Sequence, residues 1–125
     1  AREIIDWIGL GDKADMLAGT LPYGDERRVG IARALATTPE FLLLDEPAAG
    51  TNEAEIEGLM KAIARIRDDF GCGVLVVEHN MGLIMQLCER VHVIDHGRTI
   101  AIGTPASVQR DPEVRRAYLG DEEEI

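Results

Sequence analysis

Aromatic residues make up only 4% of the 125-residue sequence, so its hydrophobic core must consist of aliphatic side chains. The hydrophobic content of 46% is nevertheless enough for a packed core. Short runs of Val, Leu, Ile and Ala are typical of strands that are buried on both faces of a parallel sheet. The length fits one small domain or a piece of a larger one.

The sequence has only two cysteines, Cys72 and Cys88, and their spacing matches no metal site or disulfide framework. We expect two reduced thiols that pack as small hydrophobic side chains in a cytosolic protein. No apolar run approaches the roughly 18–20 residues that cross a bilayer, and no signal peptide is visible. These absences predict a soluble chain.

Basic residues are outnumbered, with 13 Lys and Arg against 23 Asp and Glu and a net charge of −10. This balance argues against nucleic acid as a partner, because nucleic-acid binders need a basic surface to displace counterions. Part of the acidic excess lies in residues 121–124, where we expect a solvated tail. The chain begins at Ala1, inside an expected helix, which suggests a missing N-terminal portion.

The pattern of apolar residues predicts alternating helices and strands. The spacing of apolar residues and the positions of capping residues and prolines predict helices over about 2–8, 22–38, 52–70 and 81–88, and two short helices that begin at Pro105 and Pro112. Short apolar runs predict strands over 41–45, 74–77, 91–95 and 98–102. The last two strands flank a His96-Gly97 turn and form a hairpin. Asn52 and Glu55 have the spacing of a capping box. This alternation indicates an α/β fold with a mainly parallel sheet and flanking helices.

Two carboxylates stand at the end of the first expected strand. Asp45 and Glu46 come directly after Phe41-Leu-Leu-Leu, at the strand end where open α/β sheets place their ligands. One carboxylate can hold Mg²⁺ through water, and the next can polarise an attacking water. Without further signals, a strand that ends in an acidic turn explains the same residues.

Two other segments carry weaker signals of the same site. Gly24 stands at a helix start, where backbone N–H groups and the helix dipole favour an anion, although a plain turn glycine is an alternative. His79 follows the strand ending at Val77 and would project at the same sheet edge as Asp45 and Glu46. A hydrogen-bonded structural histidine is the alternative there.

In this order, the segments resemble the ABC ATPase family. Leu21-Pro-Tyr-Gly-Asp25, followed by Arg28 and Ile31-Ala-Arg-Ala-Leu35, is similar to the family's signature motif and its helix. Phe41–Glu46 resembles the Walker B strand with its catalytic glutamate, residues 48–53 the D-loop, and Glu78-His79 the switch histidine. The resemblance covers nearly the whole chain and implies part of a P-loop NTPase fold.

A subfamily that drives the uptake of branched-chain amino acids is similar in further details. These details are the Tyr in the signature, Ala48-Ala-Gly50, and a C-terminal part with Ile102-Gly-Thr-Pro-Ala106, Asp111-Pro-Glu-Val114 and Ala117-Tyr-Leu-Gly120. The transported solute is implied by this likeness alone, because such a subunit does not contact it.

The resemblance implies a role for each matching position. Two ATPase subunits pair head to tail around two ATP molecules, on the cytoplasmic face of the membrane and against transmembrane permease subunits. Asp45 would bind Mg²⁺, Glu46 would act on the attacking water, and His79 would contact the γ-phosphate. The residues that would contact the partner's ATP, or lie at the shared interface, are Leu21, Pro22, Tyr23, Gly24, Asp25 and Asn52.

The sequence departs from the family pattern in two ways. Pro22 replaces a Ser of the signature, which removes a hydroxyl and a backbone N–H. A P-loop, Gly-x-x-x-x-Gly-Lys-Ser/Thr, is absent, because Lys13 and Lys61 are each followed by Ala. We therefore expect this chain to be inactive alone, and its unpaired strand edges either to collapse together or to pair with a second copy.

By motif, residues 1–38 hold the end of a helical subdomain with the signature, residues 39–103 the α/β core, and residues 104–125 the C-terminal helices and acidic tail. Two other functions remain open. One is a non-catalytic interaction or regulatory fragment. The other is an ABC-type ATPase of DNA repair, which the lack of sustained heptads and the acidic balance disfavour.

Overall fold

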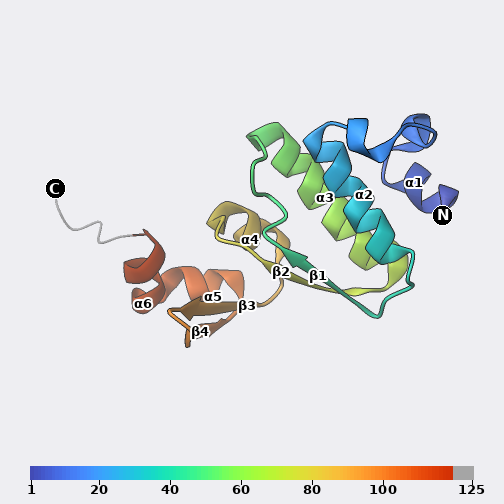
Figure 1. Cartoon of the computed structure of the whole chain (residues 1–125). Helices are drawn as coiled ribbons and strands as arrows, with labels where there is room; N and C mark the ends of the chain where they lie inside the picture. The colour runs from blue at the N-terminus through green and yellow to red at the C-terminus, as the bar shows by residue number, and fades with distance from the viewer. Residues whose placement is uncertain (120–125) are drawn as a thin grey trace. The chain divides into compact units, whose positions relative to one another are not determined.

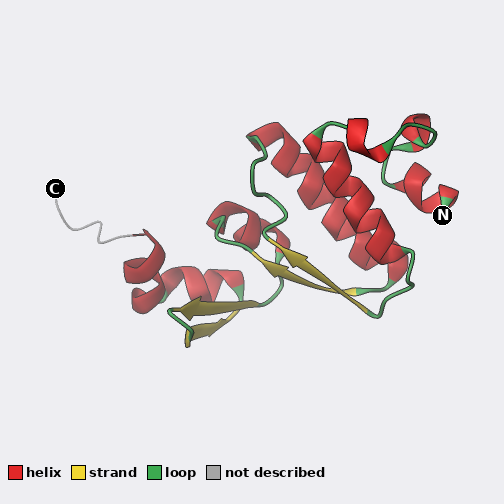
Figure 2. Ribbon diagram, in the orientation of Figure 1, coloured by secondary structure: helices red, strands yellow, loops and turns green. Residues whose placement is uncertain are grey.

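The computed structural model describes residues 1–119, so the predicted acidic tail lies outside the described part. The chain divides into two compact units, Ala1–His79 and Asn80–Ile125, which are described separately (Figure 1). These units are defined by packing, whereas the three segments above are defined by motifs. Figure 2 shows helices and strands alternating through both units.

The first unit contains three α-helices, two short 3₁₀ turns and two strands. In chain order they are α1 (Arg2–Trp7), the turns Gly11–Lys13 and Ala18–Thr20, α2 (Tyr23–Leu35), β1 (Phe41–Asp45), α3 (Glu53–Phe70) and β2 (Gly73–Val77). The second unit contains α4 (Met81–Leu87), β3 (Val91–Asp95), β4 (Arg98–Gly103), α5 (Pro105–Arg110), α6 (Pro112–Val114) and a π-helical turn over Arg115–Leu119. The predicted order of helices and strands is confirmed.

Helix α3 begins and ends as its sequence predicts. Asn52 accepts a hydrogen bond from the Glu55 N–H at 2.9 Å, and the Glu55 carboxylate accepts one from the Asn52 N–H at 3.0 Å. This capping box satisfies two N–H groups that the first helical turn leaves without partners. Gly71 then stops the helix in a left-handed conformation with φ of 60°, which glycine adopts at no steric cost.

Strands β1 and β2 pair in parallel, with Phe41 opposite Gly73 and Asp45 opposite Val77. Helices α2 and α3 lie on one side of this pair (Figure 1), and on that side Leu42 and Leu44 are buried. The core of the unit consists of Ile8, Leu10, Ile31, Ala32, Leu35, Leu42, Leu44, Ala48, Ile63, Ile66 and Cys72. The core is aliphatic, as the composition predicts.

The prediction that these strands are buried on both faces is wrong for this chain. The alternate side chains of β1 and β2 are exposed: Phe41 by 74%, Leu43 by 71%, Leu75 by 58% and Val77 by 54%. The reason is that the unit supplies helices for only one face of the strands. The apolar composition of a two-sided strand is therefore present, but the packing is one-sided.

The second unit packs short helices on a hairpin. Strands β3 and β4 pair antiparallel, and the helix caps predicted at Thr104 and Asp111 both form. The buried side chains are Leu83, Ile84, Val91, Val93, Val108 and Val114. Tyr118 donates a hydrogen bond from its hydroxyl to the carbonyl oxygen of Ile94 at 2.6 Å, which ties the C-terminal turn to β3.

Among residues 1–119 the four strands form two separate two-stranded sheets. Strand β2 belongs to the first unit and β3 to the second, so the expected collapse of the strand ending at Val77 onto the strand starting at Val91 stays a prediction. One pair forms a parallel ladder and the other an antiparallel hairpin, and in each pair both strands are edge strands. The alternative outcome, pairing of the strand edges with a second copy of the chain, also stays a prediction.

Both cysteines are free thiols, as predicted, with Cys72 buried and Cys88 partly buried. Burial raises the pKa of the Cys88 thiol, because desolvation disfavours the thiolate. Within the described residues, no helix has the length and apolar character required to cross a bilayer.

We expect His96→Asn to stabilise the hairpin by up to about 1 kcal/mol. The two-residue turn places His96 at φ of 46° and Gly97 at φ of 76°, and Asn-Gly is the preferred pair for a turn with both central residues at positive φ. The substitution also removes the exposed contact between His96 Nδ1 and Asp95 Oδ1 at 2.8 Å, which contributes little to stability. Urea unfolding measures the change. His96→Ala is the control, and an equal gain from Ala would contradict this explanation.

Candidate active site

The end of β1 and the end of β2 bring a carboxylate and an imidazole together. Glu46 follows β1, and its backbone N–H donates to the carbonyl oxygen of Val77 at 2.7 Å, which extends the parallel ladder by one bond. His79 follows β2 by one residue, and its Nδ1 lies 3.2 Å from Glu46 Oε1. The predicted proximity of these two side chains is confirmed.

Glu46 has an uncommon backbone conformation. Its φ is 45°, in the left-handed region that costs a non-glycine residue roughly 1–2 kcal/mol. Residues held in this region are frequent at functional sites, where surrounding contacts over-determine them. The side chains of Glu46 and His79 are 51% and 73% exposed, so both can reach a bound reactant.

Asp45 lies at the last position of β1, on the same exposed face as Leu43. A carboxylate there suits Mg²⁺, which binds one or two protein carboxylates and completes its shell with phosphate oxygens and water. Among residues 1–119 no group of three His, Cys, Asp or Glu side chains could hold a metal.

The segment that resembles the signature forms the start of α2. Pro22 is the N-cap, and its carbonyl oxygen accepts a hydrogen bond from the Glu26 N–H at 2.9 Å. Asp25 pairs with Lys13 across the preceding connection, in a part-buried ion pair. Tyr23 is exposed, and its ring lies 3.4 Å from the position that a Cβ on Gly50 would occupy.

Not all predicted site residues are joined by direct polar contacts among residues 1–119. Within the described part of the chain, no hydrogen bond or ion pair joins residues 21–25 to Glu46 or His79. Asn52 commits its side chain to the cap of α3. The structure therefore forms two groups, with the signature segment at α2 and the Glu46–His79 pair at the strand ends.

Two residues without a predicted role link these groups. Glu78 Oε1 accepts a hydrogen bond from the Ala48 N–H at 2.8 Å, and Arg27 donates one to the carbonyl oxygen of Pro47. The Arg27 guanidinium also reaches the Tyr23 hydroxyl at 3.1 Å and stacks 5.0 Å from its ring centroid. The sequence signal that could have pointed to Glu78 is a charged residue directly before His79, just after an apolar strand.

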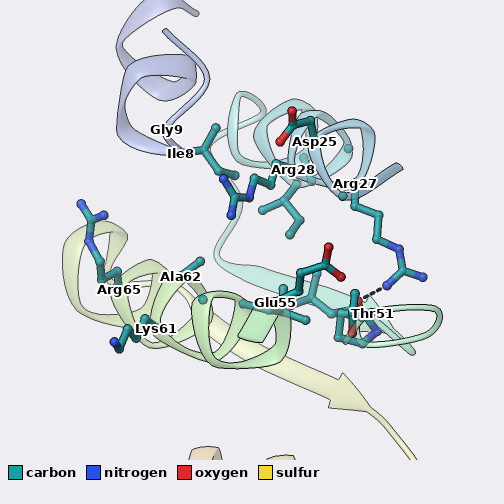
Figure 3. A pocket seen from close by; sticks show the side chains of 18 of the residues that line it. Ile8, Gly9, Asp25, Arg27, Arg28, Thr51, Glu55, Lys61, Ala62 and Arg65 are labelled. Carbon is teal, nitrogen blue, oxygen red and sulfur yellow. Dashed lines mark hydrogen bonds between the residues drawn. The ribbon is translucent and has the colours of Figure 1, made fainter. Parts of the chain in front are cut away.

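A cavity of about 680 Å³ lies between α1, α2, α3 and β1. Figure 3 shows Arg28 of α2 and Glu55 of α3 pointing into it. Its lining also includes Asp25, Lys61 and Arg65. Pro22, Gly24 and Asp45 also line it, whereas Glu46 and His79 do not. The cavity therefore includes Asp45 but not the Glu46–His79 pair.

Residues 1–49 match the family described as ABC transporter, and residues 98–124 match the family described as branched-chain amino acid ATP-binding cassette transporter. LivG of Escherichia coli K12, a high-affinity branched-chain amino acid transport ATP-binding protein, is 44% identical over 94% of this chain and 46% of its own length. LptB of Haemophilus influenzae, a lipopolysaccharide export system ATP-binding protein, is 41% identical over 98% of this chain and 50% of its own length.

Among solved structures, the ADP conformation of MJ1267, an ATP-binding cassette of an ABC transporter, superposes with a TM-score of 0.85. The two sequences are 28% identical, and the match covers 95% of this chain and 48% of that one. The chain thus spans about half the length of the curated relatives and the solved structure that it matches.

Proposed function

We propose, because the chain belongs to the ABC transporter family of ATP-binding proteins, that it is the signature and Walker B half of a transport ATPase. The N-terminal half of such a subunit would supply the P-loop. The observation that carries this proposal is the 3.2 Å approach of Glu46 and His79 at the ends of adjacent parallel strands. That edge is where α/β sheets of this kind bind nucleotides.

Three side chains at this edge would each have a different role in ATP hydrolysis. Glu46 orients and polarises the attacking water, and His79 contacts the γ-phosphate while holding the Glu46 carboxylate in place. Asp45 would hold Mg²⁺, which neutralises charge on the phosphates when bound. The exposure of Glu46 and His79 leaves both able to reach a nucleotide held by the other half of the subunit.

The signature segment would act across a dimer interface. Leu21, Pro22, Tyr23, Gly24 and Asp25 would contact the ATP of a second subunit, with Asn52 at the shared interface. A head-to-tail pair would use this segment and the Glu46–His79 pair in different composite sites. Since Pro22 lacks an N–H and a hydroxyl, later backbone donors and the helix dipole would carry the phosphate contact.

We further propose that the complete subunit works with transmembrane permease subunits at the cytoplasmic face of the membrane. Branched-chain amino acid uptake is the transport system we favour. The match of residues 98–124 to a family of that description and the identity to LivG support this choice. The solute itself would be bound by the permease subunits and not by this chain.

The proposal is tested by comparing this chain with the complete subunit. We expect the complete subunit to hydrolyse Mg-ATP, and this chain alone to show neither hydrolysis nor tight ATP binding, because it lacks the P-loop lysine and backbone cradle. Phosphate release and nucleotide titration calorimetry are the measurements. Micromolar ATP affinity of the chain alone would contradict the assignment of the phosphate cradle to the N-terminal half.

A non-catalytic interaction fragment is the second candidate function. The exposed apolar face made by Phe41, Leu43, Leu75 and Val77 favours it, because such a face tends to associate. In this case the chain would pair with a second copy or with a partner and would not depend on Glu46. This alternative would be supported if the complete subunit does not hydrolyse ATP and if Glu46→Gln leaves its binding to the partner unchanged.

A further inference from the structure

One peptide group, between Pro47 and Ala48, is held from both sides by charged side chains. Its carbonyl oxygen accepts a hydrogen bond from Arg27 Nη1, and its N–H donates to Glu78 Oε1 at 2.8 Å. Arg27 comes from the signature helix α2, and Glu78 stands between β2 and His79. The two contacts therefore join helix α2 to the end of β2 through a single amide.

The surroundings of this amide make both contacts costly to lose. The Glu78 side chain is 1% exposed, and Pro47 and Ala48 are buried. A buried backbone group without a partner bears its full desolvation cost, and hydrogen bonds to charged groups are about twice as strong as neutral ones. The Glu78 carboxylate uses its other oxygen to accept from the His79 N–H at 3.1 Å.

The held amide also sets the geometry of the turn after Glu46. The Ala49 N–H donates to the carbonyl oxygen of Glu46 at 3.1 Å, and the Thr51 hydroxyl donates to that of Ala48 at 2.6 Å. These bonds build a compact turn on the fixed peptide, directly after the left-handed Glu46. A shift of this amide would therefore move both Glu46 and the loop that leads into α3.

We infer that Arg27 and Glu78 are a pair of positioning residues that fix the Pro47–Ala48 peptide and thereby connect the signature helix to the Glu46–His79 site. Neither residue needs to contact nucleotide. Their effect on catalysis rests on the proposed function, whereas their hydrogen bonds to the peptide are a property of this chain alone. The two parts are tested by separate measurements.

Amide hydrogen exchange of Ala48 in the 125-residue chain tests the hydrogen bonds to the peptide. Glu78→Ala should speed Ala48 exchange roughly 10- to 100-fold, the factor expected when a hydrogen bond to a charged partner is lost. Glu78→Gln should give an intermediate rate, because one amide oxygen replaces two carboxylate oxygens. Arg27→Ala should also speed exchange, and Arg27→Lys should partly restore it. The β1 amide of Leu44 reports whether the fold persists, and Arg33→Ala on the same helix is the control.

The double variant decides whether the two residues act on one peptide. Removing both partners should speed Ala48 exchange by less than the product of the single effects, because residues that share a partner are not additive. If the double variant speeds Ala48 exchange by the full product of the two single effects, Arg27 and Glu78 do not act on one peptide. Single-variant exchange rates within twofold of the unchanged chain would also contradict the proposed pair of hydrogen bonds. Unfolding of Glu78→Ala leaves Glu78→Gln and the arginine variants to decide.

The catalytic part is tested in the complete subunit. We expect Glu78→Gln and Arg27→Lys to lower kcat by about 3- to 30-fold with the KM for Mg-ATP changed by less than twofold, since the peptide positions Glu46 and not the nucleotide. Faster Ala48 exchange with unchanged kcat would overturn the catalytic connection. An inactive unmodified subunit would instead refute the proposed function. The exchange rates would still show whether Arg27 and Glu78 hold the Pro47–Ala48 peptide.

Discussion

Replacing Glu46 with Gln is expected to lower the ATP hydrolysis rate of the complete subunit by at least about 100-fold and to leave ATP binding intact. A positioned general base contributes roughly 10²–10⁴-fold to a rate, and the Gln amide cannot accept the proton. Gln has nearly the same shape, so it can keep the contact that Glu46 makes with His79 at 3.2 Å. Steady-state phosphate release and nucleotide binding give the two quantities. Because ATP binds without being consumed, the variant should also accumulate as an ATP-bound dimer.

Glu40→Gln is the matched control for this substitution. Glu40 directly precedes the other end of β1 and lies outside the site, so the same chemical change there should leave the rate within about twofold. A Glu46→Gln variant with more than a tenth of the original rate would show that another group activates the water. Loss of ATP binding in that variant would indicate a structural defect and would remove the support for its catalytic role.

Local sequence signals were sufficient to predict the helices and strands and the proximity of Glu46 to His79. The capping box of Asn52 and Glu55, the glycine that ends α3 and the turn at His96-Gly97 each depend on a few neighbouring residues. Two parallel strands whose carboxyl ends meet also bring together any side chains that follow them. The proximity of Glu46 and His79, whose side chains lie 3.2 Å apart, is consistent with that geometry.

The hydrogen bonds that hold the Pro47–Ala48 peptide could not be predicted from the sequence. Arg27 lies 20 positions from Pro47, and Glu78 lies 30 positions from Ala48, and no periodic pattern links them. The one-sided packing of β1 was missed for a related reason. Apolar strand residues such as Leu43 have the same sequence pattern whether or not a second layer covers them.

Ile66→Ala is expected to destabilise the first unit by about 2–5 kcal/mol, the range for removing a large buried side chain and leaving a cavity. Ile66 is fully buried on α3, where Ile63 is also in the core, and Leu35 of α2 is buried as well. Domains have only about 5–15 kcal/mol of stability in total, so this single change removes a large share. Urea unfolding of this chain measures it, with the slope of the transition checked for constancy.

Leu43→Ala is the paired substitution that makes this test specific to the one-sided packing. Leu43 is 71% exposed on the uncovered face of β1, so in this chain its loss should cost less than about 1 kcal/mol. In the complete subunit we expect the N-terminal half to bury this face, and the same substitution should then approach the cost of Ile66→Ala. Equal costs for Leu43→Ala in the two proteins would mean that the face stays uncovered, and its apolar side chains would then be available to a different partner.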